Sequence, residues 1–144
     1  MNEVRDARPA QLTIQLLGSL HCVEERLETA LEPLGLSLAK LNALSQLVTA
    51  AEPLPLRTLA ERCACVRSNI TQLIDRLEAD DLVRRADDPR DRRSVRAELT
   101  PEGRSRHAAG MRALLKAEGE LLSRLSARQQ EDLTQLLDLL TDGG

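Results

Sequence analysis

The stretch LIDRLEADDLVRRADDPRDRRSVRAELT (residues 73–100) changes its hydrophobic period partway along. In its first part and just before it, apolar side chains recur every three or four residues, as on one face of a helix, at Ile70, Leu73, Ile74 and Leu77. In its last part, Val95, Ala97 and Leu99 alternate with polar residues, which is the pattern of a half-buried strand. LVRRA (82–86) is also compatible with a strand. The stretch therefore predicts a helix followed by a two-stranded hairpin.

The segment DPRDRR (88–93), between the two strands, holds three arginines and two aspartates in six residues. Taken alone, such a segment could be a disordered charge run, a solvated loop or a nucleic-acid contact. Strands on both sides predict that it is the tip of the hairpin.

The segments before this stretch are helical. Leu59, Ala60 and Cys63 would face inward from a short helix that begins near Pro55, and a brief break at 64–66 separates it from the helix containing Ile70. A helix capped by Ser37 precedes them, with Leu41, Leu44 and Leu47 or Val48 along one face and Pro53 beyond its end. A short helix, a turn, a second helix and a hairpin form a winged helix-turn-helix, which we place at residues 37–100.

Longer apolar helices lie at the two ends of the chain. Residues 1–9 are expected to be frayed, and a helical stripe follows within 10–36, at Leu16, Leu20, Val23, Leu27, Leu31 and Leu34. Thr100 is predicted to cap a helix that begins at Pro101 and runs to about Arg124. Ser126 is predicted to cap a last helix, with Leu133, Leu136, Leu137 and Leu140 on one face. The predicted order is α-α-α-α-β-β-α-α, mainly helical. We expect 10–36 and 101–144 to pack together and on a second copy of the chain.

Composition restricts the kind of partner. The 144 residues include no Phe, Tyr or Trp, so the core must be aliphatic, and binding of RNA or single strands by base stacking is disfavoured. The net charge is −3, yet the segment from Arg57 to Arg96 has a net charge of +2. A locally basic segment within an acidic protein fits contact with a polyanion at one place.

The helix before the hairpin carries polar side chains suited to reading base edges. Arg can bond guanine in a bidentate manner, Asn and Gln can do so with adenine, and Ser and Thr can bond bases or phosphates. The candidates, off the apolar face, are Arg67, Ser68, Asn69, Thr71, Gln72 and Arg76. The alternative for this face is simple solvation.

Residues 56–103 resemble the winged helix of the MarR (multiple antibiotic resistance regulator) family. The most specific matches are Asp88-x-Arg90-Asp91-x-Arg93 and Leu99-Thr100-Pro101-Glu102-Gly103, and LIDRLEADDLVRR (73–85) matches closely. The resemblance implies a homodimer whose terminal helices interlock, whose recognition helices enter successive major grooves of a pseudo-palindromic site, and whose wings enter the minor groove. By position, Arg93 matches the arginine inserted there and Asp91 the residue that orients it. Arg90 and Arg92 are neighbouring phosphate or groove candidates.

The chain departs from the family pattern at two places. Asp81 stands where the family often has Gly, and a left-handed conformation costs Asp more than Gly. Cys63-Ala64-Cys65-Val66 lacks the usual cap before the recognition helix, so Ser68 is a candidate cap.

Three cysteines and two histidines raise the alternative that the protein senses a metal ion or an oxidant. Cys63 and Cys65 do not have the usual Cys-x-x-Cys spacing of zinc sites, and small buried side chains are the simpler interpretation. Cys22 is a candidate redox residue. The resemblance also implies a small phenolic or carboxylate effector in a crevice between the dimer helices and the winged domain, lined by Leu17, His21 and Leu44.

The sequence therefore predicts a DNA-binding transcription regulator, a homodimeric repressor that responds to a ligand. The alternatives are a thiol- or metal-sensing regulator of the same fold, or a winged-helix protein-interaction module that has lost DNA binding. Enzyme motifs such as a P-loop or His-Glu-x-x-His are absent, so neither catalysis nor a cofactor is expected. Without a signal peptide or long apolar run, the protein is expected to be cytoplasmic.

Overall fold

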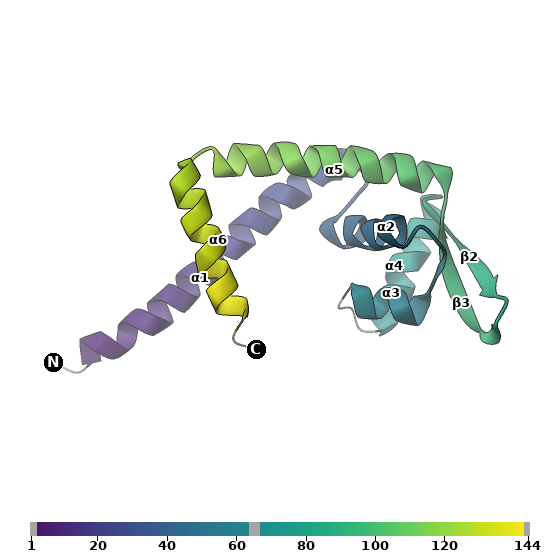
Figure 1. The fold of residues 1–144 in the computed structure, drawn as a ribbon, viewed down its shortest axis with the longest axis horizontal. Helices are drawn as coiled ribbons and strands as arrows, with labels where there is room; N and C mark the ends of the chain where they lie inside the picture. The colour runs from purple at the N-terminus through teal and green to yellow at the C-terminus, as the bar shows by residue number, and fades with distance from the viewer. Residues whose placement is uncertain (1–2, 64–66, 143–144) are drawn as a thin grey trace. The chain divides into compact units, whose positions relative to one another are not determined.

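The computed structural model describes the backbone of residues 3–63 and 67–142, and the side chains of 10–63 and 69–142. Six α-helices, one 3-10 turn and three strands follow one another within these residues (Figure 1). In chain order they are α1 (Glu3–Leu31), η1 (Glu32–Leu34), α2 (Leu38–Ala50), β1 (Leu54–Pro55), α3 (Leu56–Arg62), α4 (Arg67–Ala79), β2 (Val83–Asp88), β3 (Asp91–Leu99), α5 (Pro101–Leu122) and α6 (Ala127–Thr141). The predicted winged helix-turn-helix fold is confirmed.

The chain forms two compact units, and their boundaries fall inside α1 and α5. One unit comprises Leu27–Leu114, and the other combines Met1–Arg26 with Leu115–Gly144. The sequence analysis placed the boundaries at the ends of these helices instead. Because α1 and α5 are continuous helices, their composition does not mark the residue at which one compact unit ends and the other begins.

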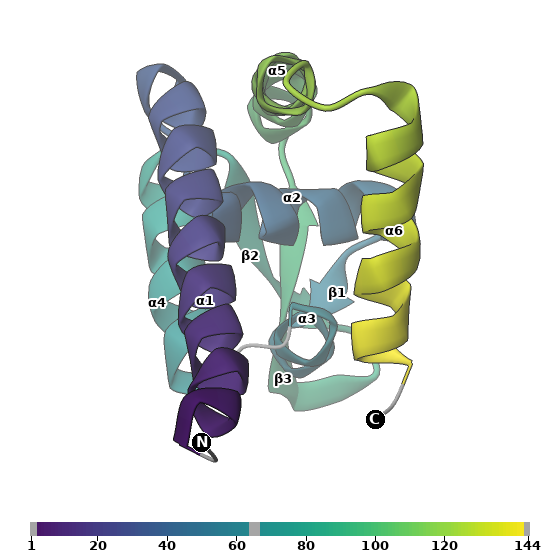
Figure 2. The same ribbon diagram turned by 90° about the vertical axis from the view of Figure 1, so that its left-hand side faces the viewer.

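The core lies in the unit Leu27–Leu114, where α2, α3 and α4 pack beside the small sheet (Figure 2). Ser37 caps α2 as predicted, with its hydroxyl accepting a hydrogen bond from the Lys40 amide at 3.1 Å. The inward residues predicted for α2 and α4 are buried: Leu41, Leu44, Leu47, Ile70, Leu73, Ile74 and Leu77. An entirely aliphatic core therefore fixes the helix before the hairpin with its polar face outward.

The sheet has three strands in the order β1-β3-β2, one strand more than predicted. β1 pairs antiparallel with β3, with Leu54 opposite Ala97 and Pro55 opposite Arg96. Two residues are too few to show an alternating pattern, so the sequence could not reveal β1. This strand attaches the hairpin to the segment that leads into α3.

The hairpin is longer than the sequence analysis predicted, and its tip is narrower. β2 continues to Asp88 and β3 begins at Asp91, so only Pro89 and Arg90 form the turn. The Asp88 carboxylate accepts a hydrogen bond from the Arg90 amide at 2.9 Å, which is the usual way in which Asp stabilises a tight turn. Cross-strand pairing thus extends into the charged segment, against the local preference of Asp and Arg. We call the distal part of this β2–β3 hairpin the wing, and it extends beyond α2–α4 in Figure 1.

The first helix begins earlier than expected. Residues 1–9 were predicted to be frayed, but α1 starts at Glu3 and continues through Pro9. A proline within a helix removes one backbone hydrogen bond, which here does not end the helix. Burial increases along the predicted stripe, from Leu16 at 47% exposed and Leu20 at 51% to Leu31 at 0%.

The α4–β2 turn packs against the start of α5. Asp81 has φ = 60°, the left-handed conformation expected where the family often has Gly. Thr100 caps α5, its hydroxyl accepting from the Gly103 amide at 2.9 Å and donating to the Asp81 carbonyl at 2.7 Å. The predicted cap is therefore confirmed, and it joins the start of α5 to the end of the helix-turn-helix.

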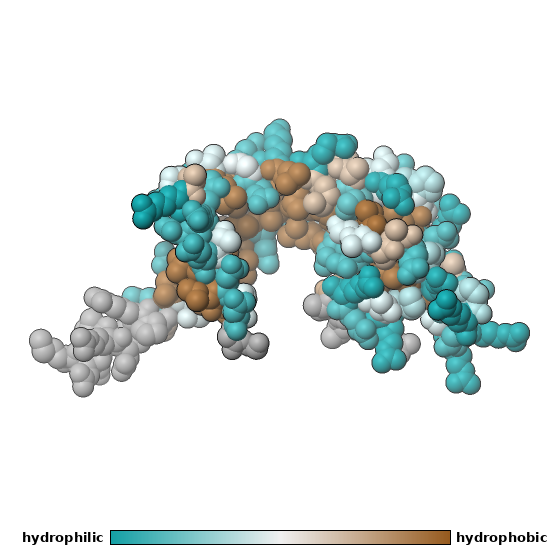
Figure 3. All heavy atoms as spheres, in the orientation of Figure 1, coloured by the Kyte–Doolittle hydropathy of each residue, from teal (hydrophilic) through white to brown (hydrophobic). Residues whose placement is uncertain are grey.

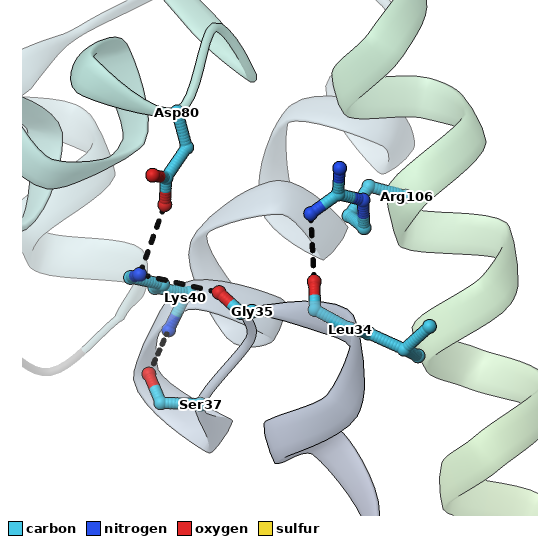
Figure 4. A network of polar contacts seen from close by, with 6 residues as sticks. All are labelled: Leu34, Gly35, Ser37, Lys40, Asp80 and Arg106. Atoms are coloured by element: carbon cyan, nitrogen blue, oxygen red, sulfur yellow. Dashed lines mark hydrogen bonds and ion pairs between the residues drawn. The ribbon is translucent and has the colours of Figure 1, made fainter.

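A polar network close to this turn joins further elements of the unit (Figure 4). Lys40 Nζ donates to the Gly35 carbonyl at 3.2 Å and pairs with Asp80 at 3.1 Å, just after α4. Arg106 of α5 donates to the Leu34 carbonyl at 2.7 Å. These contacts fix α4 relative to α2 and fix α5 relative to η1.

The last helix has the cap that the sequence predicts. α5 ends at Leu122, two residues before the expected end, and the Ser126 hydroxyl accepts from the Gln129 amide at 3.2 Å. The Gln129 side chain accepts from the Ser126 amide in return, which completes a capping box. Among the described residues, no helix is both long and apolar enough to span a membrane.

Candidate nucleic-acid interface

The exposed face of α4 carries four of the six predicted reading residues. Asn69, Thr71, Gln72 and Arg76 are all exposed, while the apolar face between them is buried. Arg67 and Ser68 lie at the start of α4, but their side chains, and the break at 64–66, fall outside the described residues. The structure therefore exposes all four side chains and places Asn69, Gln72 and Arg76 close together on one side of α4, and these are side-chain types that can bond base edges.

The wing presents its arginines to solvent. Arg90, Arg92 and Arg93 are exposed, and within the described part of the chain their guanidinium groups make no ion pair or hydrogen bond. Figure 3 shows hydrophilic atoms over this end of the molecule. An exposed, uncompensated guanidinium is available to a phosphate or to a narrow minor groove.

Asp91 acts on the backbone of Arg93. Its Oδ1 accepts a hydrogen bond from the Arg93 amide at 2.9 Å, in the same arrangement as Asp88 with Arg90. The aspartates therefore shape the backbone from which the arginines project.

A cleft beside the wing contains the predicted Arg90 and two further basic residues, Arg62 and Arg96, that were not predicted from the sequence. It has a volume of about 400 Å³ and lies between the segment 52–62 and the wing, lined by three arginines, Arg62, Arg90 and Arg96, together with Glu52 and Asp88. Arg96 donates to the Pro53 carbonyl at 3.4 Å and lies 3.9 Å from Asp88. The strict alternation of 94–100 placed Arg96 on the polar face, but only the β1 pairing shows what that face contacts.

Arg85 is another basic residue whose role no pattern in the sequence indicates. Its guanidinium bonds Asp75 Oδ1 at 2.5 Å and Glu78 Oε1 at 3.0 Å, and its amide donates to Glu78 Oε2 at 3.0 Å. The hydrogen bond to Asp75, followed by the charges of both carboxylates, raises the pKa of Arg85 despite the opposing effect of burial. Arg85 thus connects β2 to the outer face of α4.

The three residues predicted to line an effector crevice differ in exposure. Leu17 is 59% exposed, and His21 is exposed and lies 3.3 Å from Glu25 on the next turn of α1. Leu44 is 0% exposed and belongs to the core of the winged unit. Leu44 is therefore unavailable as a lining residue, because the α2 side chains at i, i+3 and i+6 all point into that core.

The cysteines are not arranged as a metal site in the described part of the chain. Cys22 is exposed and Cys63 is half-buried, while Cys65 lies outside the described residues. Over the described residues, no group of three or more His, Cys, Asp or Glu side chains is placed to hold a metal ion.

Large apolar side chains are exposed on the unit formed by the two ends of the chain. Eleven of its Leu and Ile residues are at least 38% exposed: Leu12, Ile14, Leu16, Leu17, Leu20, Leu115, Leu133, Leu136, Leu137, Leu139 and Leu140. Hydrophobic atoms of this unit are visible in Figure 3. A groove of about 520 Å³ with a mainly apolar wall lies between α1 and the end of α5, near Cys22, Val23 and Leu121. Monomeric proteins rarely expose apolar surface on this scale unless something binds it.

His107 of α5 is the only histidine of the winged unit. Its Nε2 lies 2.9 Å from the Ser45 hydroxyl on α2. Burial, and then the charge of Arg104, lower the pKa of His107 from its ordinary value of 6.5. The folded protein therefore favours the neutral imidazole.

Because of His107, the winged unit is expected to become less stable as the pH falls. A lowered folded-state pKa means that the unfolded chain binds the proton more readily, so stability is fully present above about pH 6.5 and is lost as the pH falls below it. Comparing urea midpoints at about pH 7.5 and 5.5, we expect His107→Gln to reduce the acid destabilisation seen in the wild type. His21→Gln, at the exposed histidine, is the control. An unchanged pH dependence in His107→Gln would contradict the assignment.

The fold and the site together define a winged helix-turn-helix protein of the class that reads double-stranded DNA, with a polar helix and an arginine-rich wing on one unit. The comparisons with known proteins agree. The MarR family profile matches residues 36–95, which run from just before α2 into β3. Over these residues the chain is similar to the MarR family, and HTH-type and MarR family transcriptional regulators are among the proteins that it resembles.

Individual relatives are moderately similar. An uncharacterized HTH-type transcriptional regulator, YkoM of Bacillus subtilis (strain 168), is 38% identical over 61 residues, which are 42% of this chain and only 40% of the length of YkoM. Sco3205, a MarR family transcriptional regulator from Streptomyces coelicolor solved in complex with DNA, is 25% identical, with a TM-score of 0.81 over 95% of this chain and 88% of its own. The organohalide-sensing regulator RdhR, solved with 2,4-dichlorophenol bound, is 18% identical, with a TM-score of 0.84 over 94% of this chain and 80% of its own. At that identity, RdhR supports the fold alone.

Proposed function

We propose that this chain is a homodimeric repressor that binds a pseudo-palindromic site on double-stranded DNA and releases it when a small molecule binds. The observation that carries the proposal is the presence, on one compact unit, of an exposed helix face with Asn69, Gln72 and Arg76 and of a wing with unpaired Arg90, Arg92 and Arg93. The helix face fits the major groove, and the wing fits the negative potential of a minor groove.

Dimerisation is supported by the exposed leucines of α1 and α6. A helix such as α6, which has no buried residue in this chain, gains little from packing within it. A second copy would cover the apolar stripe, and a twofold axis would place two recognition helices against two half-sites.

Response to a small molecule is a separate part of the proposal. It is supported by the open apolar groove near Cys22, whose rim includes Arg26 and Arg124. An apolar wall beside two cations suits a small organic anion. Addition of small phenols and aromatic carboxylates to the DNA complex tests this part separately, by loss of the bound fraction.

The test of DNA binding is selection by the purified full chain from a pool of random-sequence duplexes. We expect enrichment of one inverted repeat, with half-site centres about one helical turn apart. Enrichment of no sequence, with binding no tighter than to unselected duplex, would leave the fold intact and exclude sequence-specific recognition. The same outcome would favour a winged helix used for protein contacts. The selected duplex is called the operator below.

Replacing Arg93 with alanine is expected to weaken binding to the operator by roughly tenfold or more and to reduce the salt slope by about two, one phosphate or groove contact for each wing of the dimer. Fluorescence anisotropy between about 50 and 200 mM salt measures both quantities. Arg112→Ala, which removes an equal charge from an exposed position of α5, is the control. Equal affinity and slope for Arg93→Ala and Arg112→Ala would remove Arg93 from the interface.

A further inference from the structure

The wing is anchored by apolar contacts only at its base. Val83 and Ala97 are 0% exposed, but none of residues 86–96 is buried, and Val95 is 38% exposed. A two-stranded hairpin of this kind has little stability or fixed direction of its own in water. Polar contacts must therefore set the angle at which the wing leaves the winged unit.

The strongest of these contacts join Arg85 to α4. Asp75 and Glu78 are three residues apart on the outer face of α4, and both accept from the Arg85 guanidinium, at 2.5 and 3.0 Å. Glu78 uses its second oxygen for the Arg85 amide at 3.0 Å. Glu78 thus holds the backbone and the side chain of one β2 residue, and we call these three residues the Arg85 clamp.

The clamp lies where it can resist a swing of the wing. Arg85 is opposite Ala97, in a row that continues to Leu54, so its side chain leaves the sheet on the face that covers the core. Its side chain is 29% exposed, against 59% for Asp75 and 42% for Glu78. Partial desolvation and the fork geometry of the guanidinium make this more than a surface ion pair.

The polar contacts of Arg96 with Pro53 and Asp88 also hold the wing, but they are weaker and do not involve α4. Arg96 projects from the opposite face of the hairpin, and its contacts to Pro53 and Asp88 are 3.4 and 3.9 Å long. The Arg85 clamp is therefore the contact that relates the wing directly to the helix proposed to read DNA.

We infer that Asp75, Glu78 and Arg85 are positioning residues that hold the wing at a set angle to α4, so that wing and helix engage one duplex without further ordering. The inference rests on the proposed function for its effect on DNA, but not for its effect on the wing itself. Two carboxylates on the outer face of a DNA-reading helix would otherwise only repel phosphates. If these carboxylates hold the wing and α4 in place before DNA binds, they lower the cost of ordering both parts on binding.

This inference and simple electrostatics predict opposite signs for one variant. Asp75→Asn with Glu78→Gln removes two negative charges near the DNA and removes the charged clamp. Electrostatics alone predicts tighter binding, because fewer charges oppose the phosphates. Loss of positioning predicts weaker binding. The variant leaves Arg85 in place, so a direct phosphate contact by Arg85 would also appear as tighter binding.

The experiment uses the full-length protein and two readouts. Backbone ¹⁵N relaxation without DNA is expected to show order parameters for the amides of residues 86–95 falling from about 0.85 toward 0.6 or below in Asp75→Asn/Glu78→Gln. Binding to the operator is expected to weaken by roughly tenfold. Asp87→Asn removes an exposed wing carboxylate that makes no side-chain hydrogen bond or ion pair among the described residues, and we expect its wing to stay ordered and its affinity to be unchanged or higher.

The outcomes separate the two proposals. Wing amides that stay as ordered in the double variant as in Asp87→Asn would overturn the clamp, as would tighter binding to the operator. If the wild type selects no duplex, the proposed function fails, and the relaxation measurement alone still decides whether the clamp holds the wing. A urea midpoint within experimental error of the wild type shows that the winged unit itself is intact.

Discussion

A variant with Leu136→Glu and Leu140→Glu on α6 is expected to be monomeric and to lose binding to the operator. These leucines are 58% and 66% exposed, lie one helical turn apart, and share a stripe with Leu133 and Leu137. In the proposed dimer each substitution occurs twice, because a twofold interface uses the same surface of both copies.

The expected effect is large because apolar burial and charge act together. Covering a leucine contributes about 1.5–3 kcal/mol, and four lost leucines, at about 1.4 kcal/mol per tenfold, correspond to a dissociation constant raised at least about ten-thousandfold. Burial of four new carboxylates would add to this. A monomer holds one recognition helix and one wing, so it also loses the gain in effective concentration from binding two half-sites together.

Analytical ultracentrifugation across a protein dilution series measures the dimer, and anisotropy measures operator binding. Leu139→Glu is a matched control, because Leu139 is the most exposed leucine of α6 at 76% and lies off the stripe. We expect this variant to remain dimeric. A dimeric Leu136→Glu/Leu140→Glu protein would show that α6 is not the interface, and a monomeric protein that binds the operator as well as the wild type would show that DNA recognition does not need the dimer.

Gly103→Ala is expected to destabilise the winged unit by about 3 kcal/mol or more, at the upper end of overpacking effects. A Cβ at this position would overlap the carbonyl oxygen of Leu82 and come within 2.9 Å of Leu99 Cδ1. The Leu82 carbonyl also accepts a hydrogen bond from the Thr100 amide at 3.1 Å, so it cannot move away without loss. The start of α5 would have to shift from the α4–β2 turn, and the Thr100 cap would shift with it.

Urea unfolding at a fixed protein concentration, followed by circular dichroism, measures this change. The same substitution at Gly119, in the same helix, is the control, because a Cβ there has no heavy atom within 4 Å. Alanine is the better helix former, so Gly119→Ala is expected to be stabilising by about 0.5–1 kcal/mol. If Gly103→Ala were also stabilising, the close approach of α5 to Leu82 would be wrong.

Family resemblance identified the LTPEG motif around Gly103, but it did not explain the glycine. The reason is a contact between segments separated by about twenty residues, which no local pattern contains. The same holds for Arg85, which appears in the sequence as one more basic residue of a basic segment. Its partners Asp75 and Glu78 look like ordinary solvated carboxylates on a helix face, and only the hairpin register brings Arg85 to them.

The sequence by itself determined the features that depend on neighbouring residues. Helix caps at Ser37, Thr100 and Ser126, and the inward face of α4, follow from hydrogen bonds and periodicity within one or two turns. Only the tertiary structure decided the existence of β1, the length of the hairpin and the contacts of Arg85 and Arg96. Each of these depends on which distant segment lies alongside, and that is set by packing of the whole core rather than by local preference.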